Sequence, residues 1–231
     1  MSERAVVKLV FLGDSLTWGG YGGNFVAEAA RLLPQHAIIN AGEGGNTVLN
    51  LLERVDSVLE TQQPDGVFVM VGGNDAISYS QPATRPYYRQ AQKIPDGFVS
   101  PETFARAYRD LLARIQLAHA LVWVGLLPLE YNPETAAAMR RYNALAADAA
   151  RSLNMPTLDL MAELAPADVP PRPPLTLAAV NLIGRRVAAG WADYETERRR
   201  EGFTYSFDGT HFTPQTALRV AARLVSFLAL P

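Results

Sequence analysis

The sequence contains no cysteine, and this absence removes several kinds of chemistry at once. Disulfide bonds, thiolate metal sites and a cysteine nucleophile are excluded, because each of them needs a thiol. A chain without disulfides suits a reducing compartment, so we expect a cytoplasmic protein. Any catalytic nucleophile must come from another side chain.

An excess of charge of one sign is also missing. The 21 Lys and Arg residues nearly balance the 23 Asp and Glu residues, and the formal net charge is −2. Proteins that bind a phosphate backbone carry a basic stripe or patch, and nothing in this balance indicates one. We therefore expect no nucleic-acid partner.

Long hydrophobic runs are missing as well. A membrane-spanning helix needs about 18 or more consecutive apolar residues, and no stretch of this sequence approaches that length. The apolar run from Ala5 to Leu12 is short, and it lacks the small-residue cleavage site of a signal peptide. We predict a strand for this run and a soluble protein with no membrane span.

Short apolar runs recur along the chain, and turn residues follow each of them. Such runs are typical of strands that are buried on both faces. They lie at residues 6–12, 37–41, 67–71, 121–126 and 157–160. Segments with helical spacing lie between them, for example at 48–59 and 104–115. This alternation predicts an α/β protein with a parallel sheet and helices on both faces.

Several helix boundaries carry their own signals. Proline is favoured at the first helical position, where its missing N–H would have no partner in any case. A capping side chain precedes such a proline at Ser100-Pro101, Asn132-Pro133 and Thr213-Pro214. Each pair predicts a helix start, and the last helix is expected to run from about Pro214 to Leu228.

We expect a single domain over residues 1–231, because the Pro-rich candidate linkers are too short to separate two folding units. Insertions interrupt the alternation at about residues 79–99 and 161–206. In the second insertion, apolar residues at helical spacing between Leu177 and Tyr194 predict one amphipathic helix, packed on the sheet or over its rim. We interpret the arginine-rich run at 197–201 as a solvated helix end rather than a binding patch.

Clusters of small and polar residues follow the first three predicted strands. They are Gly-Asp-Ser-Leu at 13–16, a glycine-rich segment at 40–47 and Gly-Gly-Asn-Asp at 72–75. Open α/β sheets bind their ligands at the C-terminal ends of parallel strands. Ser15 taken alone is also typical of a helix cap, but its place after a buried strand suits a nucleophile. Asn74 offers an amide donor at the same edge of the sheet.

A fourth cluster, Asp-Gly-Thr-His at 208–211, precedes the last helix. A carboxylate and an imidazole in one tight turn can form a hydrogen bond, which fixes the ring tautomer and stabilises its charged form. A serine alone is a weak nucleophile, and a paired base activates it. The other histidines, His36 and His119, lie beside no acid in a comparable turn, and we interpret them as structural.

Taken together and in this order, the four blocks resemble those of the GDSL or SGNH hydrolase family of serine esterases. The matching positions are 13–16, Gly45, 72–75 and 208–211, so the resemblance spans most of the chain. It implies a flavodoxin-like three-layer α/β/α sandwich around a parallel five-stranded sheet, which agrees with the five predicted strands. It implies no metal and no organic cofactor.

The resemblance also assigns roles to individual residues. Ser15 would be the nucleophile, His211 the general base, and Asp208 the residue that orients His211. The oxyanion hole would be formed by the backbone N–H groups of Ser15 and Gly45 and by the side-chain amide of Asn74. The long insertion before Asp208 departs from the family pattern and leaves the shape of the substrate pocket open.

These roles predict that the protein hydrolyses a carboxylic ester through an acyl-enzyme on Ser15. The expected partner is therefore a small-molecule ester substrate. Short acyl esters and acetylated carbohydrates are the substrates that the resemblance suggests. An acyltransferase or a thioesterase would use the same triad, and this alternative stays open. A non-catalytic binding module would be expected to lose the serine, the histidine or the oxyanion donors, and all are present. The oligomeric state also stays open.

Other polar and aromatic residues near these blocks admit two interpretations. Asp14 and Asp75 are expected to brace loops rather than to act in catalysis, whereas Asp159 is expected either to orient a loop or to touch substrate. A set of aromatic residues either lines an acyl or sugar pocket or packs locally: Trp18, Tyr79, Tyr87, Tyr88 and Phe98. The glycine clusters match no nucleotide-binding motif, so phosphate binding is not expected.

Overall fold

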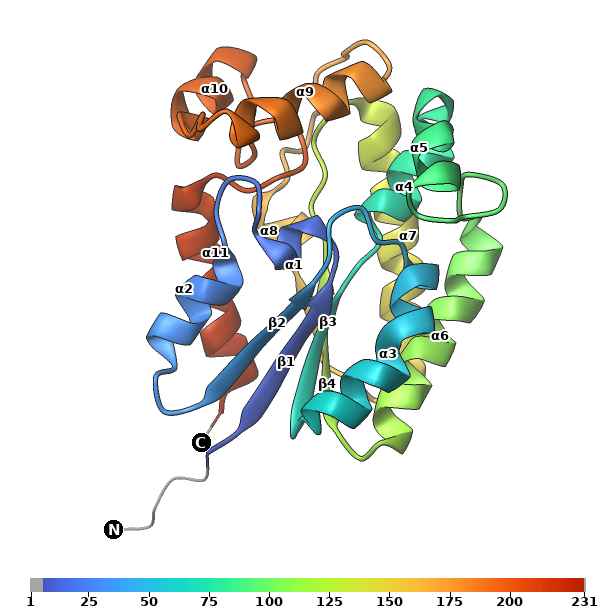
Figure 1. Cartoon of the computed structure of the whole chain (residues 1–231), viewed down its shortest axis with the longest axis vertical. Helices are drawn as coiled ribbons and strands as arrows, with labels where there is room; N and C mark the ends of the chain where they lie inside the picture. Colours follow the sequence, from blue (N-terminus) through green and yellow to red (C-terminus); the bar gives the residue numbers. More distant parts are fainter. Residues whose placement is uncertain (1–5, 231) are drawn as a thin grey trace.

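The computed structural model describes residues 6–230, and its centre is a five-stranded parallel sheet with the order β2-β1-β3-β4-β5 (Figure 1). The strands are β1 (Lys8–Gly13), β2 (Ala37–Gly42), β3 (Gly66–Met70), β4 (Leu121–Leu126) and β5 (Thr157–Asp159). The predicted α/β fold with five parallel strands is confirmed. Ala5, at the start of the first predicted strand, lies outside the described residues.

The strand boundaries differ from the prediction by one or two residues. β1 begins at Lys8 rather than at Val6, and β5 ends at Asp159 because Leu160 already begins a helix. Every residue of β3 is buried, as are five of the six residues of β1, which explains their continuous apolar runs. The edge strand β2 has no fully buried residue.

Helices cover both faces of the sheet (Figure 1). α2 and α11 pack against each other on one side, while α3, α6 and α7 form the layer on the other side. The helices are α1 (Ser15–Trp18), α2 (Phe25–Leu32), α3 (Val48–Gln62), α4 (Gly73–Ser80), α5 (Arg85–Gln90), α6 (Pro101–Leu117), α7 (Pro133–Ser152), α8 (Leu160–Leu164), α9 (Leu177–Ala188), α10 (Tyr194–Glu201) and α11 (Pro214–Leu228), with a 3₁₀ turn, η1, at Pro82–Thr84. None of the helices within residues 6–230 is long and apolar enough to cross a membrane.

The three predicted cap-and-proline helix starts are confirmed. The side chains of Ser100, Asn132 and Thr213 each accept a hydrogen bond from the backbone N–H three residues further on. Each of these helices, α6, α7 and α11, has proline at its first position. Local sequence therefore fixes where these helices begin, before any packing is considered.

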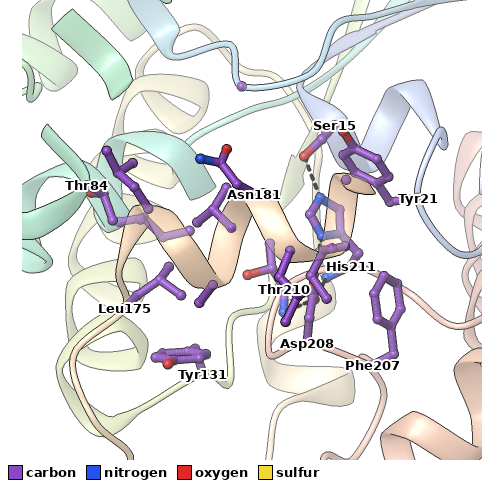
Figure 2. A pocket seen from close by; sticks show the side chains of 18 of the residues that line it. Ser15, Tyr21, Thr84, Tyr131, Leu175, Asn181, Phe207, Asp208, Thr210 and His211 are labelled. Atoms are coloured by element: carbon purple, nitrogen blue, oxygen red, sulfur yellow. Dashed lines mark hydrogen bonds and ion pairs between the residues drawn. The ribbon is translucent and has the colours of Figure 1, made fainter. Parts of the chain in front are cut away.

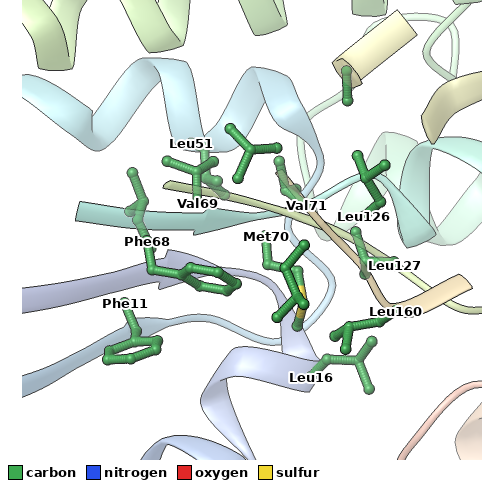
Figure 3. Packing of buried hydrophobic residues seen from close by; sticks show 14 of the residues in the cluster. Phe11, Leu16, Leu51, Phe68, Val69, Met70, Val71, Leu126, Leu127 and Leu160 are labelled. Carbon is green, nitrogen blue, oxygen red and sulfur yellow. The ribbon is translucent and has the colours of Figure 1, made fainter. Parts of the chain in front are cut away.

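The core fills the space between the sheet and its two helical layers. Phe11 of β1 contacts Phe68 of β3 at 5.5 Å between ring centroids, and it contacts Phe25 of α2 at 6.1 Å. Figure 3 shows Leu16 and Leu160 close to this cluster, near the C-terminal ends of the strands. Each fully buried aliphatic or aromatic side chain contributes roughly 1.5–3 kcal/mol. This packing makes the C-terminal edge of the sheet a rigid platform for the loops that follow the strands.

In the second insertion the predicted amphipathic helix forms as α9, but it is shorter than predicted, and a separate helix, α10, follows it. α9 ends at Ala188, and α10 begins at Tyr194. Gly190 lies between them in the left-handed region with a φ of 85°, a conformation that ends helices and that favours glycine. α9 passes over the C-terminal edge of the sheet (Figure 1), and none of its residues is fully buried.

The arginine-rich run at 197–201 is a helix end, as interpreted, and Arg199 and Arg200 are exposed, but the run is not solvated throughout. It forms the end of α10, but Glu197 is only 7% exposed. Both carboxylate oxygens of Glu197 accept hydrogen bonds from Arg186 of α9, at 2.6 and 3.0 Å, and Arg200 donates a further one at 2.6 Å. The run therefore joins α10 to α9.

Candidate active site

Ser15 lies directly after β1, as the first residue of the short helix α1. The helix is capped by Asp14, whose carboxylate accepts a hydrogen bond from the backbone N–H of Leu16 at 3.0 Å. Asp14 is therefore the cap, and the hydroxyl of Ser15 remains available. Ser15 is 8% exposed and lines a cavity at the C-terminal edge of the sheet.

Asp208 and His211 come from the loop before α11, and the structure brings them to Ser15 (Figure 2). Asp208 Oδ1 accepts hydrogen bonds from the backbone N–H groups of Thr210 and His211, at 3.0 and 2.8 Å. Asp208 Oδ2 lies 2.7 Å from His211 Nδ1, and His211 Nε2 lies 2.9 Å from Ser15 Oγ. Because the carboxylate can only accept, Nδ1 carries the ring proton and donates to it, and Nε2 is left free to accept the proton of the serine.

The same contacts shift the pKa values of both side chains. Burial alone would lower the pKa of His211, but the adjacent Asp208 carboxylate outweighs burial and raises it. For Asp208, burial would raise the pKa, yet the attraction and the hydrogen bond of His211 lower it below its usual value. Asp208 is therefore held as a carboxylate, which stabilises the imidazolium form of His211.

Aromatic side chains fix the imidazole ring from its sides. Tyr21 meets His211 edge to face at 5.3 Å between centroids, and Phe207 stacks on it at 6.0 Å. Trp18 in turn packs edge to face on Tyr21 at 5.3 Å. The ring of His211 has little freedom to turn away from Ser15.

The predicted oxyanion donors Gly45 and Asn74 line the same cavity as Ser15, which has a volume of about 950 Å³. Gly45 has a φ of 80°, and a Cβ atom at this position would lie 2.2 Å from the hydroxyl of Tyr87. The positive φ favours glycine here, and a side chain would also displace the end of the Tyr87 side chain. Asn74 is the second residue of α4, and its amide nitrogen donates to the carbonyl of Asn46 at 3.0 Å.

The two insertions supply most of the remaining cavity wall. The sequence left open whether five aromatic residues line a pocket or pack locally. Three of them, Trp18, Tyr87 and Tyr88, line the cavity. Tyr79 and Phe98 instead pack against each other at 6.3 Å. α9 crosses the cavity opposite the sheet, and Figure 2 shows Asn181 of this helix across from Ser15. Charged side chains line the end of the cavity near α10: Arg172, Arg185, Arg186, Arg200, Glu197 and Glu201.

The neighbouring acids brace the loops, as expected. Both carboxylate oxygens of Asp75 lie 3.2 Å from the backbone N–H of Val48, at the start of α3. Burial raises the pKa of Asp14 to about 7 and that of Asp75 to about 8. Asp159 caps α8 by accepting from the backbone N–H of Ala162 at 2.9 Å, so it orients a loop.

Neither of the other two histidines lines the cavity, which agrees with their structural interpretation. His36 Nδ1 accepts from the backbone N–H of Val7 at 3.2 Å, just before β1. His119 follows α6 with a φ of 60°, where the chain turns toward β4. Among residues 6–230, no three side chains of His, Asp or Glu are grouped so that they could hold a metal ion.

Sequence reasoning missed two residues that organise the site. Arg54 of α3 donates to the carbonyl groups of Gly13 and Ala41, at 3.1 and 2.8 Å, and so ties the end of β1 to the end of β2. Glu130, in the loop after β4, accepts hydrogen bonds from the segment that precedes Asp208. Its place in the loop that follows a buried strand was the available signal, since Ser15 and Asn74 also follow buried strands.

A parallel α/β/α sandwich with a hydrogen-bonded serine, histidine and aspartate at its C-terminal edge is the arrangement of a serine hydrolase. The family model described as GDSL-like Lipase/Acylhydrolase matches residues 11–217, and the chain belongs to this family.

One protein of similar sequence and two solved structures of similar fold are also esterases or lipases/acylhydrolases. An acetylxylan esterase of Geobacillus stearothermophilus is 36% identical over 86 residues, an alignment that covers 29% of this chain and 39% of that protein. A crystal structure of Axe2, an acetylxylan esterase from the same organism, has a TM-score of 0.67 at 18% identity, over 100% of this chain and 98% of that chain. A lipase/acylhydrolase from Enterococcus faecalis has a TM-score of 0.63 at 20% identity, over 96% and 94% of the two chains. The likeness to the two solved structures concerns the fold.

Proposed function

We propose that this protein is a serine esterase in which Ser15 is the nucleophile, His211 the general base and Asp208 the residue that orients His211. The proposal rests on two consecutive hydrogen bonds. One joins Asp208 Oδ2 to His211 Nδ1 at 2.7 Å, and the other joins His211 Nε2 to Ser15 Oγ at 2.9 Å. Membership of the GDSL-like lipase/acylhydrolase family supports the same chemistry.

The reaction proceeds in two steps. His211 Nε2 takes the proton of Ser15 as the serine oxygen attacks the ester carbonyl, and the protonated imidazole then gives this proton to the leaving alcohol. In the second step His211 removes a proton from water, which attacks the acyl carbonyl. The bond from Ser15 Oγ to the acyl carbon then breaks, the imidazolium returns its proton to Ser15 Oγ, and the acid is released. Asp208 stabilises the imidazolium that forms in each step, because its carboxylate stays ionised and accepts a hydrogen bond from the Nδ1–H group.

The negative charge that develops on the carbonyl oxygen needs donors at the same place. The backbone N–H groups of Ser15 and Gly45 and the side-chain amide of Asn74 fill this role. Their common position on the wall of one cavity supports the assignment. Each such donor contributes about 10²–10³ to turnover in comparable enzymes.

For the substrate we propose a short acyl ester, with acetylated carbohydrates as the foremost class. Acetylxylan esterase is found among the similar sequences and among the similar structures, and the cavity combines aromatic side chains such as Trp18 and Tyr87 with polar groups. Aromatic faces and hydrogen-bonding groups together suit the apolar faces and hydroxyl groups of a sugar ring.

The test compares wild type with Ser15→Ala on p-nitrophenyl esters from acetate to palmitate and on acetylated xylooligosaccharides. Labelling with a fluorophosphonate, mapped by mass spectrometry, accompanies the assay. We expect label on Ser15, fastest turnover on acetyl esters and loss of turnover in Ser15→Ala. A folded wild type that neither takes the label nor cleaves any ester would refute the proposal. Faster reaction with a thioester, or transfer of the acyl group to an added alcohol, would redirect it to a thioesterase or a transferase.

A further inference from the structure

The side-chain amide of Asn74 is held from two sides. Its nitrogen Nδ2 donates to the backbone carbonyl of Asn46 at 3.0 Å, and its oxygen Oδ1 accepts from the hydroxyl of Tyr88 at 2.9 Å. A carbonyl oxygen can only accept, so the amide nitrogen must face Asn46. The amide oxygen therefore faces Tyr88, and the hydroxyl of Tyr88 must be the donor. Chemistry alone settles which way the amide points.

This orientation determines what the amide can offer to a ligand. Nδ2 carries two hydrogen atoms, and the carbonyl of Asn46 takes one of them. The second N–H is therefore available to donate to a ligand in the cavity, which both Asn74 and Ser15 line. If the amide turned over, its oxygen would take the place of this donor and would repel a developing negative charge.

We propose that Tyr88 is a positioning residue, whose hydroxyl fixes the Asn74 amide with its free N–H toward the oxyanion. The inference rests on the proposed function, because it assumes that Asn74 is an oxyanion donor. It gives the insertion at 79–99 a part in catalysis, since Tyr88 lies on α5 within this insertion.

The surroundings of Tyr88 suit a fixed donor. The side chain is 4% exposed, its ring meets Tyr87 edge to face at 5.1 Å, and its backbone carbonyl accepts from the N–H of Ile94 at 3.0 Å. Burial, reinforced by the nearby Tyr87, Asp75 and Asp14, keeps the pKa of Tyr88 well above its ordinary value. The hydroxyl thus retains its proton across the pH range in which a histidine base works.

The experiment measures kcat and KM for wild type, Tyr88→Phe, Asn74→Ala and the double variant on p-nitrophenyl acetate. Loss of the hydroxyl leaves the amide oxygen without a partner, and we expect kcat to fall on the order of tenfold with little change in KM. In the Asn74→Ala background, Tyr88→Phe should cause no further fall in kcat, because there is no amide left to hold. A boronic acid, which forms a tetrahedral adduct with the serine, should bind Tyr88→Phe more weakly by about the factor lost in kcat/KM.

Tyr142→Phe is the matched control. Tyr142 is also fully buried, and its hydroxyl also donates one hydrogen bond, to the carbonyl of Val99. It should lose stability as Tyr88→Phe does, but kcat should stay at the wild-type value. Equal kcat in wild type and Tyr88→Phe, or an equal further fall in the Asn74→Ala background, would overturn the inference.

Other outcomes separate this inference from the proposed function. If wild type cleaves no ester and Ser15 takes no fluorophosphonate, the proposed function itself fails. If Asn74→Ala is as active as wild type, the assignment of Asn74 fails. If Tyr88→Phe does not fold, NMR of wild type decides: a Tyr88 hydroxyl proton protected from exchange and close to the Asn74 side chain supports the inference, and a rapidly exchanging one overturns it.

Discussion

The carboxylate of Glu130 accepts a hydrogen bond from the hydroxyl group of Ser206 at 2.7 Å, and the same hydroxyl oxygen accepts one from the backbone N–H of Gly209 at 3.0 Å. Gly209 lies between Asp208 and His211 in the loop before α11. Glu130 also accepts from three successive backbone N–H groups, at residues 204–206, over distances of 2.9 to 3.0 Å. The loop that carries the base is thus anchored to the end of β4 through one buried carboxylate.

Replacing Glu130 with glutamine should loosen this anchor. Glutamine keeps one acceptor oxygen but turns an NH₂ group toward backbone donors, and Glu130 is only 2% exposed. We expect the free energy of unfolding to fall by about 2–4 kcal/mol, measured by urea denaturation, together with a lower kcat. Glu163→Gln is the control, because Glu163 pairs with Arg223 at the surface. This variant should lower the free energy of unfolding by less than about 1 kcal/mol. Equal losses in the two variants would contradict the anchoring role.

Asp208→Asn should change the pH dependence of the reaction as well as its rate. A histidine acts as a base only when it is unprotonated, so kcat/KM rises as the pH passes through the pKa of His211. The Asp208 carboxylate raises that pKa, and an amide would remove this effect. The acidic limb of the pH profile should therefore move to lower pH, while kcat falls on the order of 10⁴ because the ring loses its fixed tautomer. An unmoved acidic limb, with Ser15 still labelled by a fluorophosphonate, would show that another group sets it.

Asp75→Asn should make stability less sensitive to pH. Burial raises the pKa of Asp75 from 3.8 to about 8, so the folded state keeps a proton that the unfolded state loses. The stability that Asp75 contributes is complete below pH 3.8 and declines as the pH rises toward 8. The difference in Tm between pH 5 and pH 8 should shrink in Asp75→Asn. Asp110→Asn, on the surface beside Arg114, should leave this difference as in wild type. A steeper pH dependence in Asp75→Asn would reverse the sign of the argument.

The parts of the molecule that follow from local sequence were predicted well. The strands are continuous apolar runs because their residues are buried on both faces, and helix starts such as Ser100 cap themselves with their own side chains. The residues of the candidate site follow strands or precede the last helix, so their meeting at one edge of the sheet follows from a parallel topology.

The contacts that hold these residues in place could not be predicted, because they form only when separate elements pack against each other. Glu130 and Ser206 are 76 residues apart, and the partner of Asn74 lies on a helix within an insertion. The end of α9 depends on the left-handed backbone of Gly190, which competed with an apolar spacing that continues to Tyr194. The burial of Glu197 depends on Arg186, which α9 brings to it.

Gly45→Ala tests whether the backbone N–H of residue 45, in the loop between β2 and α3, stabilises the developing negative charge. An added Cβ atom would lie 2.2 Å from the Tyr87 hydroxyl and 2.4 Å from the side-chain nitrogen of Gln92, on a residue with a φ of 80°. The ends of the Tyr87 and Gln92 side chains can move away, but the backbone conformation at a φ of 80° is strained for alanine. We expect residue 45 to relax from this conformation, which moves its N–H from its position on the cavity wall. We expect kcat to fall on the order of 10²–10³, and the free energy of unfolding to fall by about 1–2 kcal/mol from the backbone conformation alone.

The neighbouring glycine provides the control for this variant. A Cβ atom on Gly44 would meet only the ring of Trp18, at 3.6 and 3.7 Å, which is ordinary van der Waals contact. Gly44→Ala should therefore keep both its stability and a kcat close to that of wild type, in the same urea denaturation and p-nitrophenyl acetate assays. If Gly45→Ala loses stability but keeps its kcat, the N–H of residue 45 is not an oxyanion donor, and Ser15 and Asn74 are left to stabilise the charge.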